Sequence, residues 1–102
     1  MIGFLKNLFL PPSPLNIDEL LQKGAIILDV RTEREFKTAH AKRSINIPLD
    51  KLGKNLSSLK KDKPVITCCA SGMRSTAAKN ILKRNGFTEV YNAGSWGNVI
   101  TK

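Results

Sequence analysis

The chain has 102 residues, of which 41% are hydrophobic and 25% are charged. This length suits one small domain with a core of its own and is too short for two, and the ordinary composition excludes a protein that is disordered throughout. The formal net charge is +9 at pH 7, but the few aromatic residues do not alternate with the basic ones, so nucleic-acid binding is not indicated.

The first fourteen residues, MIGFLKNLFLPPSP, form an apolar stretch that Lys6 interrupts and that Pro11 and Pro12 end. The stretch is too short to span a bilayer, and it has neither a basic start nor a small-residue cleavage site. We expect residues 1–14 to be an N-terminal tail, either a short amphipathic turn or frayed, and residues 15–102 to form the domain. Weak contact of the tail with a membrane or a partner is the alternative.

From residue 16 onward, short apolar runs of strand length alternate with segments that have helical spacing. Asn16 is expected to cap the first helix, which Gly24 would end, and Thr32 and Glu35 have the spacing of a capping box. Gly53 weakens the third helix. The sequence thus predicts helices over residues 16–24, 32–40, 49–61 and 74–87, and strands over residues 25–30, 44–48, 64–69 and 89–94.

This alternation predicts an α/β fold with a small parallel β-sheet covered by helices on both faces. Ligands of such sheets bind beyond the carboxyl ends of the strands. The stretch CCASGMRST, residues 68–76, lies at this edge, between the end of a strand and the start of a helix. It is therefore the first candidate for a functional site.

A strand-to-helix turn directs several backbone N–H groups toward one point and adds the positive end of the helix dipole, which favours an anion there. Gly72 permits the backbone angles of such a cradle, and the small residues Ala70 and Ser71 are expected to leave its mouth open. A Cys69 thiolate inside would be stabilised by these N–H groups, by the dipole, and by Arg74 if that side chain turns inward. These features predict a reactive nucleophile.

The chain's two cysteines are adjacent and are expected to differ. Side chains alternate along a strand, so Cys68 must point to the face opposite Cys69, and we expect it to be buried and inert. A cysteine that ends an apolar strand is usually a small core residue, and this is the alternative for Cys69. The glycine-bearing turn, the helix after it and the arginine five positions on favour the catalytic interpretation.

A disulfide between neighbouring cysteines is strained and closes no useful loop, so both thiols are expected to be reduced. Reduced thiols favour a cytoplasmic location. A periplasmic location stays open, although no clear signal peptide is seen.

The basic residues gather along the sequence around the same stretch. Residues 36–88 hold twelve Lys and Arg residues against Asp50 and Asp62. We expect this excess to surround residues 68–76, where a positive field would attract anions and lower the pKa of a thiol. For most of the twelve, however, solvated side chains on helix faces are the favoured interpretation.

The chain resembles the rhodanese, or thiosulfate sulfurtransferase, family in two stretches. One, CCASGMRSTAAKNILKRNGFTEVYNAGSW, is similar to that family's active-site loop, the helix after it and the last strand. The other, ILDVRTEREFKTAHAKRSINIPL, is similar to its amino-terminal signature, with Asp-Val-Arg, an acid and aromatic pair, a His and Asn-Ile-Pro. The resemblance covers residues from about 16 to 98 in the family's order, so it is specific.

The resemblance implies an enzyme, a sulfurtransferase with Cys69 as its catalytic residue. The thiolate would take the outer sulfur of thiosulfate, or of a similar small anion, as a persulfide and pass it to cyanide, a thiol or a protein acceptor. Backbone N–H groups of the loop would hold the persulfide's charge, and Arg74 would attract the anionic donor. No metal, organic cofactor or nucleic acid is implied, and no stable membrane span. The implied donor-binding loop consists of Ala70, Ser71, Gly72, Met73, Arg74 and Ser75.

Four further residues are candidates for support of the cleft. Asp29 and Arg31 close the first strand and could line the cleft, but ion pairing is the favoured role, with Glu35 as the candidate partner of Arg31. His40 is expected to make a structural hydrogen bond rather than to act as a general base. Trp96 is expected to pack near the cleft.

One loop departs from the family pattern. Where the family commonly has Gly-His-Ile followed by Pro-Gly-Ala, this chain has AHA at residues 39–41 and KRS at residues 42–44. The missing glycines change a loop expected near the cleft and place Lys42 and Arg43 there. This departure leaves the identity of the sulfur acceptor open.

Two other functions stay open. A phosphatase or arsenate reductase would also use a cysteine and an arginine around an oxyanion, but with a longer loop between the two. Four residues separate Cys69 from Arg74, and this tighter loop favours sulfur over phosphate. The second alternative is a rhodanese-like module that relays a persulfide to one partner, or only binds it, without free turnover.

Overall fold

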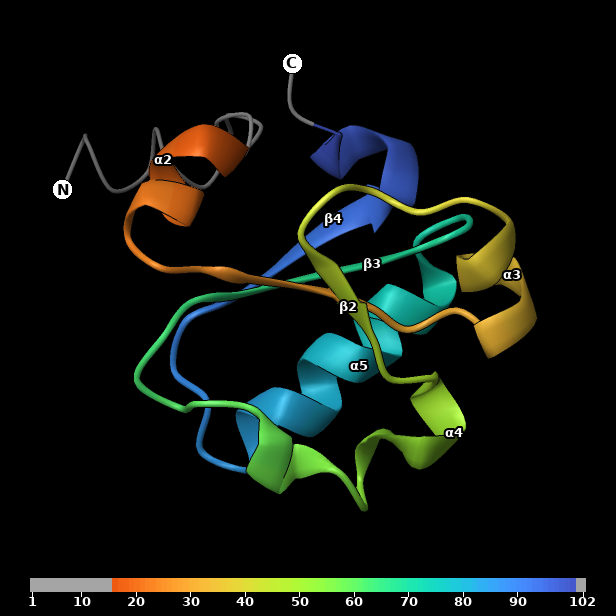
Figure 1. Cartoon of the computed structure of the whole chain (residues 1–102). Helices are drawn as coiled ribbons and strands as arrows, with labels where there is room; N and C mark the ends of the chain where they lie inside the picture. The colour runs from red at the N-terminus through yellow and green to blue at the C-terminus, as the bar shows by residue number, and fades with distance from the viewer. Residues whose placement is uncertain (1–15, 101–102) are drawn as a thin grey trace, which may run out of the picture.

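The computed structural model of the chain describes residues 16–100, which form a parallel sheet with helices on both sides (Figure 1). The strands are β1 (Ile26–Asp29), β2 (Ser44–Asn46), β3 (Val65–Cys69) and β4 (Val90–Ser95). The helices are α2 (Ile17–Gln22), α3 (Glu33–Thr38), α4 (Leu49–Leu52) and α5 (Met73–Arg84), and two 3₁₀ turns are η1 (Leu56–Ser58) and η2 (Trp96–Val99). No helix among residues 16–100 is long and apolar enough to cross a membrane. The predicted N-terminal tail, residues 1–14, lies outside the described part of the chain.

The helix caps that the sequence predicts are present. The Asn16 side chain accepts a hydrogen bond from the N–H of Glu19 at 3.0 Å, which caps α2. Thr32 and Glu35 make both reciprocal bonds of a capping box at the start of α3. Each cap satisfies N–H groups that the first turn of a helix leaves without partners.

One helix is shorter than the sequence predicts. A single helix is expected over residues 49–61, but α4 ends at Leu52, and the chain after Gly53 forms the separate turn η1. Glycine is a poor helix former because its free backbone loses the most entropy in a helix. The leucine pattern marks a buried face rather than one continuous helix, since all four of its members pack into one core cluster: Leu49, Leu52, Leu56 and Leu59.

The sheet has the strand order β2-β1-β3-β4, and all neighbouring strands are parallel. Helices α4 and α5 with η1 cover one face, and α2 with η2 covers the other (Figure 1). Two hydrophobic clusters fill these interfaces, one containing Leu28 and Leu82 and the other Ile27 and Val99. Burial of each such side chain contributes about 1.5–3 kcal/mol. The predicted fold, a parallel sheet covered on both faces, is confirmed.

Strand β3 carries the candidate nucleophile. It lies between β1 and β4, and all five of its residues are buried. The pleat places Cys69 in the cluster beneath α5 and Cys68 in the cluster on the α2 side. The prediction that the two cysteines point to opposite faces is therefore confirmed.

The loop between α3 and β2 contains a strained backbone position. Arg43 has a φ of 67°, and among residues 16–100 no other residue except glycine has a positive φ. A left-handed conformation costs a residue with a Cβ about 1–2 kcal/mol, because the Cβ crowds the next carbonyl oxygen. Arg43 is exposed, so burial does not offset this cost. In the family pattern that the chain resembles, the position of Arg43 is a glycine.

Replacement of Arg43 by glycine should stabilise the fold by about 1 kcal/mol. Relief of the left-handed strain should exceed the extra entropy that glycine gives the unfolded chain. Urea unfolding measures the change. The matched control is Lys42→Gly, at an exposed neighbour without a positive φ, which should lower the unfolding free energy by about 0.5–1 kcal/mol. An Arg43→Gly protein that is less stable than the wild type would contradict the inference that the backbone of Arg43 is strained.

Candidate active site

The loop between β3 and α5 lies at the carboxyl edge of the sheet, where the sequence predicts the site (Figure 1). Its last residue, Gly72, has a φ of 104° and is the N-cap of α5. Glycine adopts this angle without the strain that a Cβ would cause. The resulting sharp turn brings the N–H of Gly72 back onto the sulfur of Cys69, three residues earlier.

Three hydrogen-bonding groups converge on the Sγ of Cys69. The backbone nitrogens of Gly72 and Ser75 lie 2.9 Å and 3.4 Å from it, and the Ser75 hydroxyl oxygen lies at 3.5 Å. Burial raises the pKa of the Cys69 thiol, but the hydroxyl of Ser75 and the N–H groups of Ser75, Gly72 and Ser71 together outweigh it. The pKa therefore lies below the ordinary value of 9.0, which favours the nucleophilic thiolate.

The loop covers the sulfur. Ala70 and Ser71 are exposed, and Met73 is 81% exposed, but Cys69 itself is 0% exposed. The expectation that small residues leave the mouth open is therefore wrong for this conformation, because the backbone of the loop folds over the side chain.

Cys68 has a different environment from its neighbour. Among residues 16–100 no group donates a hydrogen bond to its sulfur, and its side chain is fully buried. Burial, with the negative charge of Asp29, raises the pKa of the Cys68 thiol to about 12, although Arg31 opposes the shift. Its predicted burial is confirmed, and its inertness follows as an expectation, because the thiolate is the reactive form.

Arg74 does not turn into the cradle. Its guanidinium donates two hydrogen bonds to Glu35 of α3, at 2.7 Å and 3.0 Å. Arg74 and a backbone bond from Thr32 lower the pKa of Glu35 to about 2, and the carboxylate raises the pKa of Arg74. The pair joins α3 to α5 beside the loop. The sequence suggests Glu35 as a partner of Arg31 instead, which is wrong, because Arg31 is held by Asp29.

Asp29 and Arg31 form a buried ion pair at the end of β1. The Asp29 carboxylate accepts hydrogen bonds from the Arg31 guanidinium, the shortest at 2.8 Å, and one from the Arg31 backbone N–H. The guanidinium also donates to the carbonyl of Ala39 at 2.7 Å and lies 4.7 Å from the ring centre of Trp96. The pair thus ties β1 to the loop after α3 and to η2. None of these residues donates a hydrogen bond to the sulfur of Cys69.

His40 makes local contacts at the end of α3. Its Nδ1 lies 2.7 Å from the carbonyl oxygen of Phe36, and the two rings stack with their centres 3.8 Å apart. The imidazole is exposed and has no hydrogen bond to Cys69. These contacts give His40 a structural hydrogen bond.

Asn92 of β4 is the residue at the site that the sequence reasoning missed. Its amide oxygen accepts hydrogen bonds from the Ser75 hydroxyl at 2.6 Å and from the Gly94 N–H at 2.9 Å. Its amide nitrogen donates to the Thr76 hydroxyl at 2.7 Å. A polar residue inside the strand-forming run EVYNAG was the signal that could have identified it.

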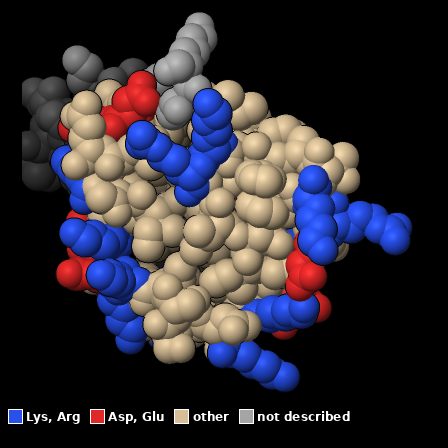
Figure 2. Space-filling view, in the orientation of Figure 1, with Lys and Arg blue, Asp and Glu red and all other residues tan. Residues whose placement is uncertain are grey.

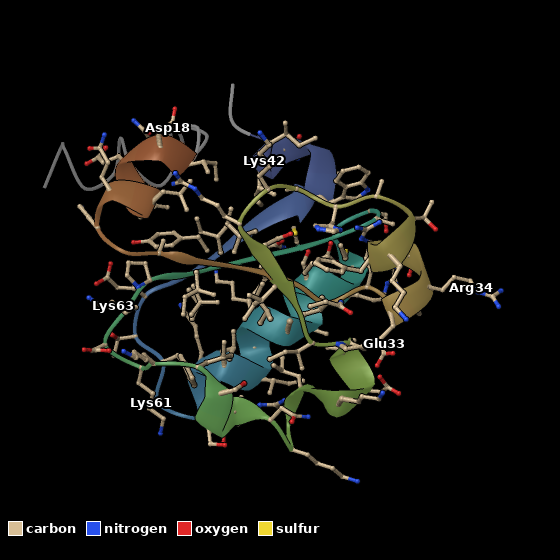
Figure 3. The ribbon with its side chains drawn as sticks, in the orientation of Figure 1. Asp18, Glu33, Arg34, Lys42, Lys61 and Lys63 are labelled. Carbon is tan, nitrogen blue, oxygen red and sulfur yellow. The ribbon has the colours of Figure 1, made fainter. Side chains whose placement is uncertain are left out.

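The positive charge does not gather on the loop. Figure 2 shows Lys and Arg in separate groups toward the margin of this view, with Asp and Glu next to several of them. Lys61 and Lys63 come before β3, which Cys69 ends, and they lie at the side away from α3 (Figure 3). Lys83 and Arg84 end α5, whose first turn is at the loop. For these four residues the expectation of a surrounding positive field is wrong, because charges close in sequence are spread along a strand and a helix.

The arrangement suits nucleophilic chemistry at one sulfur. Cys69 has a thiol whose charged form is favoured, and the N–H groups beside it stabilise negative charge at that place. Within residues 16–100 no carboxylate or imidazole hydrogen-bonds to the sulfur. In the same part of the chain no group of three or more His, Cys, Asp or Glu side chains could hold a metal ion.

Comparison with known proteins finds relatives along most of the chain. A family model described as the rhodanese-like domain matches residues 13–98. The chain is 39% identical over 70 residues to the uncharacterized protein YqhL of Bacillus subtilis, covering 69% of this chain and 56% of that protein. It is 36% identical over 69 residues to the thiosulfate sulfurtransferase PspE of Escherichia coli, covering 66% of each. The chain thus spans two thirds or less of the length of these relatives.

Among solved structures, the chain is similar to a rhodanese with anions from E. coli. The two superpose with a TM-score of 0.71 at 30% sequence identity, over 76% of this chain and 94% of the other.

The pair of Glu35 and Arg74 should make the stability of the fold depend on pH. The pKa of Glu35 is lowered from 4.5 to about 2 in the folded protein. Its contribution is therefore complete above about pH 4.5 and is lost as the pH falls toward 2. Glu35→Gln should flatten the pH dependence of the unfolding free energy in this window. Because both side chains are about one third exposed, solvent screening keeps the effect near 0–1 kcal/mol.

Urea unfolding across the acidic range measures this effect. Glu33→Gln is the matched control, because the pair of Glu33 and Lys51 is more exposed, at 58% and 56%, and should flatten the curve less. Parallel curves for the wild type and Glu35→Gln would contradict the prediction.

Proposed function

The chain belongs to the rhodanese-like domain family, and we propose that it is a sulfurtransferase that forms a persulfide on Cys69. Its donor is thiosulfate or a similar sulfane compound, and its acceptor is a thiophilic nucleophile. The observation that carries the proposal is the convergence of the Gly72 and Ser75 N–H groups on the sulfur that ends β3. Thiosulfate is the donor in the name of the relative PspE, and it enters here as the proposed substrate.

The first step is a displacement at sulfur. The Cys69 thiolate attacks the outer sulfur of thiosulfate, the S–S bond of the donor breaks, and sulfite leaves with the electron pair. In the second step an acceptor such as cyanide attacks the outer sulfur of the persulfide. Thiocyanate leaves, and the Cys69 thiolate is restored with its electron pair. This is covalent catalysis in two half-reactions, with no net oxidation of the enzyme.

The loop supports this chemistry through its backbone. Both the thiolate and the persulfide carry a negative charge, and N–H groups that are held in place stabilise such a charge without reorganisation. The N–H groups of Gly72 and Ser75 already contact Sγ. We expect the remaining N–H groups between Ala70 and Ser75 to bind the outer sulfur.

Arg74 acts at the rim of the site rather than inside it. Its guanidinium is held by Glu35, which neutralises much of its charge. The arginine therefore contributes to the position of the loop, and the backbone carries most of the anion binding. This arrangement disfavours phosphatase or arsenate reductase chemistry, which needs an arginine directed at a tetrahedral oxyanion.

Cys69→Ser should abolish sulfur transfer from thiosulfate to cyanide, because serine is a far weaker nucleophile than a thiolate. Cys68→Ser, the matched control on the same strand, should keep most of the activity. The measurement is the rate of thiocyanate formation by each variant. Equal loss in both variants would contradict the assignment of the two cysteines.

The mass of the intact protein after treatment with thiosulfate gives an independent test. We expect the wild type to gain one sulfur atom and Cys69→Ser to gain none. A gain of one sulfur without cyanide turnover would indicate relay to a dedicated partner. Hydrolysis of phosphate esters without any gain of sulfur would overturn the proposal.

A further inference from the structure

The Ser75 hydroxyl has one proton and three acceptors within reach. These are the Asn92 amide oxygen at 2.6 Å, the Gly72 carbonyl at 3.0 Å and the Cys69 sulfur at 3.5 Å. The Gly72 carbonyl already accepts hydrogen bonds from the N–H and the hydroxyl of Thr76. While Cys69 is a thiol, the Ser75 hydroxyl therefore donates its hydrogen bond to the Asn92 amide oxygen. The thiol in turn donates a hydrogen bond to the Ser75 oxygen.

The Asn92 amide has one acceptable orientation. Its oxygen accepts the N–H of Gly94 at 2.9 Å, and its nitrogen donates to the Thr76 hydroxyl at 2.7 Å. That hydroxyl uses its proton on the Gly72 carbonyl. A reversed amide would set its NH₂ group against the Gly94 N–H and its oxygen against a hydroxyl with no proton left to donate. An acceptor oxygen therefore always faces Ser75.

We propose that Asn92 is a positioning residue for Cys69 that acts through Ser75: its amide oxygen holds the Ser75 hydroxyl proton and competes with the sulfur for it. When the sulfur is neutral, Ser75 accepts from it. When the sulfur becomes a thiolate or persulfide, the hydroxyl must leave Asn92 before it can donate to the negative charge. The proposal rests on the proposed role of Cys69 as the nucleophile.

The charges around the sulfur do not involve Asn92. The titratable groups that face the site lie on other elements and belong to two ion pairs and one buried thiol: Arg74 with Glu35, Asp29 with Arg31, and Cys68. On β4 the titratable side chain is Tyr91, whose hydroxyl faces Glu89. Replacement of Asn92 by alanine leaves all of these charges in place, so a change in acidity reports on the Ser75 hydroxyl.

The test is a pH titration of the Cys69 thiolate by its ultraviolet absorbance. The full-length protein carries Cys68→Ala, so one thiol remains, and the same titration of a protein without either cysteine is subtracted. Asn92→Ala should lower the pKa of Cys69 by about one unit, because the freed hydroxyl donates to the thiolate. Ser75→Ala should raise the pKa.

The combination of both changes separates this role from a merely structural one. In the Ser75→Ala protein, Asn92→Ala should shift the pKa no further, because no hydroxyl remains to be freed. Asn98→Ala is the matched control: it removes another amide near the end of β4, one that donates to the Ala93 carbonyl and has no bond to Ser75, and should leave the pKa unchanged.

Two results would overturn the proposal. One is a Cys69 pKa that Asn92→Ala leaves unchanged or raises. The other is a fall of the Cys69 pKa that is equally large when Asn92→Ala is added to the Ser75→Ala protein. If Asn92→Ala does not fold, Asn92→Asp replaces it; this keeps an acceptor at Ser75 and adds a negative charge, so the pKa should rise, and a fall would overturn the proposal. The titration measures the pKa of the Cys69 thiol rather than the rate of sulfur transfer. It therefore gives a result even in a protein that transfers no sulfur.

Discussion

The left-handed backbone of Gly72 is the constraint on which the site depends. Its φ of 104° turns the chain so that the Gly72 N–H points back to the sulfur of Cys69, and it also starts α5 at Met73. The first N–H groups of a helix have no partner within the helix, so the N–H of Ser75, in the first turn, is free to contact the same sulfur. One glycine therefore positions both backbone donors. A residue with a Cβ at this position would strain the turn and move both together.

The loop itself has little to hold it in place, because Ala70 and Ser71 are small and exposed. Its geometry comes from contacts with elements on either side. On one side Glu35 of α3 holds Arg74, and on the other Asn92 of β4 holds the hydroxyls of Ser75 and Thr76. Anchors on α5 alone would let the loop shift with that helix. Because the anchors lie on two further elements, the sulfur and its donors keep their positions only when the whole sheet edge is assembled.

The features that the sequence predicts well are those with local causes. Capping residues, apolar runs and the alternation of side chains along a strand act over a few residues, so they identify the strands, the parallel sheet, the helices other than the one expected over residues 49–61, and the opposite directions of Cys68 and Cys69. The partner of Arg74 lies 39 residues away, and Asn92 lies 17 residues from Ser75. No local pattern specifies such contacts, because they depend on which elements the fold brings together.

The same limit applies to charge. Lysines that surround the loop in sequence lie at the far ends of β3 and α5, because a strand and a helix both carry the chain away from the site. The sequence therefore overstated the positive field and missed the hydrogen bonds that act in its place. The resting sulfur relies on short-range donors, which salt screens much less than it screens a field of exposed charges.

The two cysteines provide an internal comparison of these effects. They are adjacent on one strand, and both are 0% exposed, so burial opposes ionisation of each. Cys68 lacks donors and faces the charge of Asp29, and its pKa rises to about 12. Cys69 faces the N–H groups and hydroxyl of the loop, and its pKa falls below the ordinary value. Since the two backbone positions differ by one residue, the lowered pKa of Cys69 comes from the loop that follows it, and we expect a cysteine without that loop to behave as a core residue.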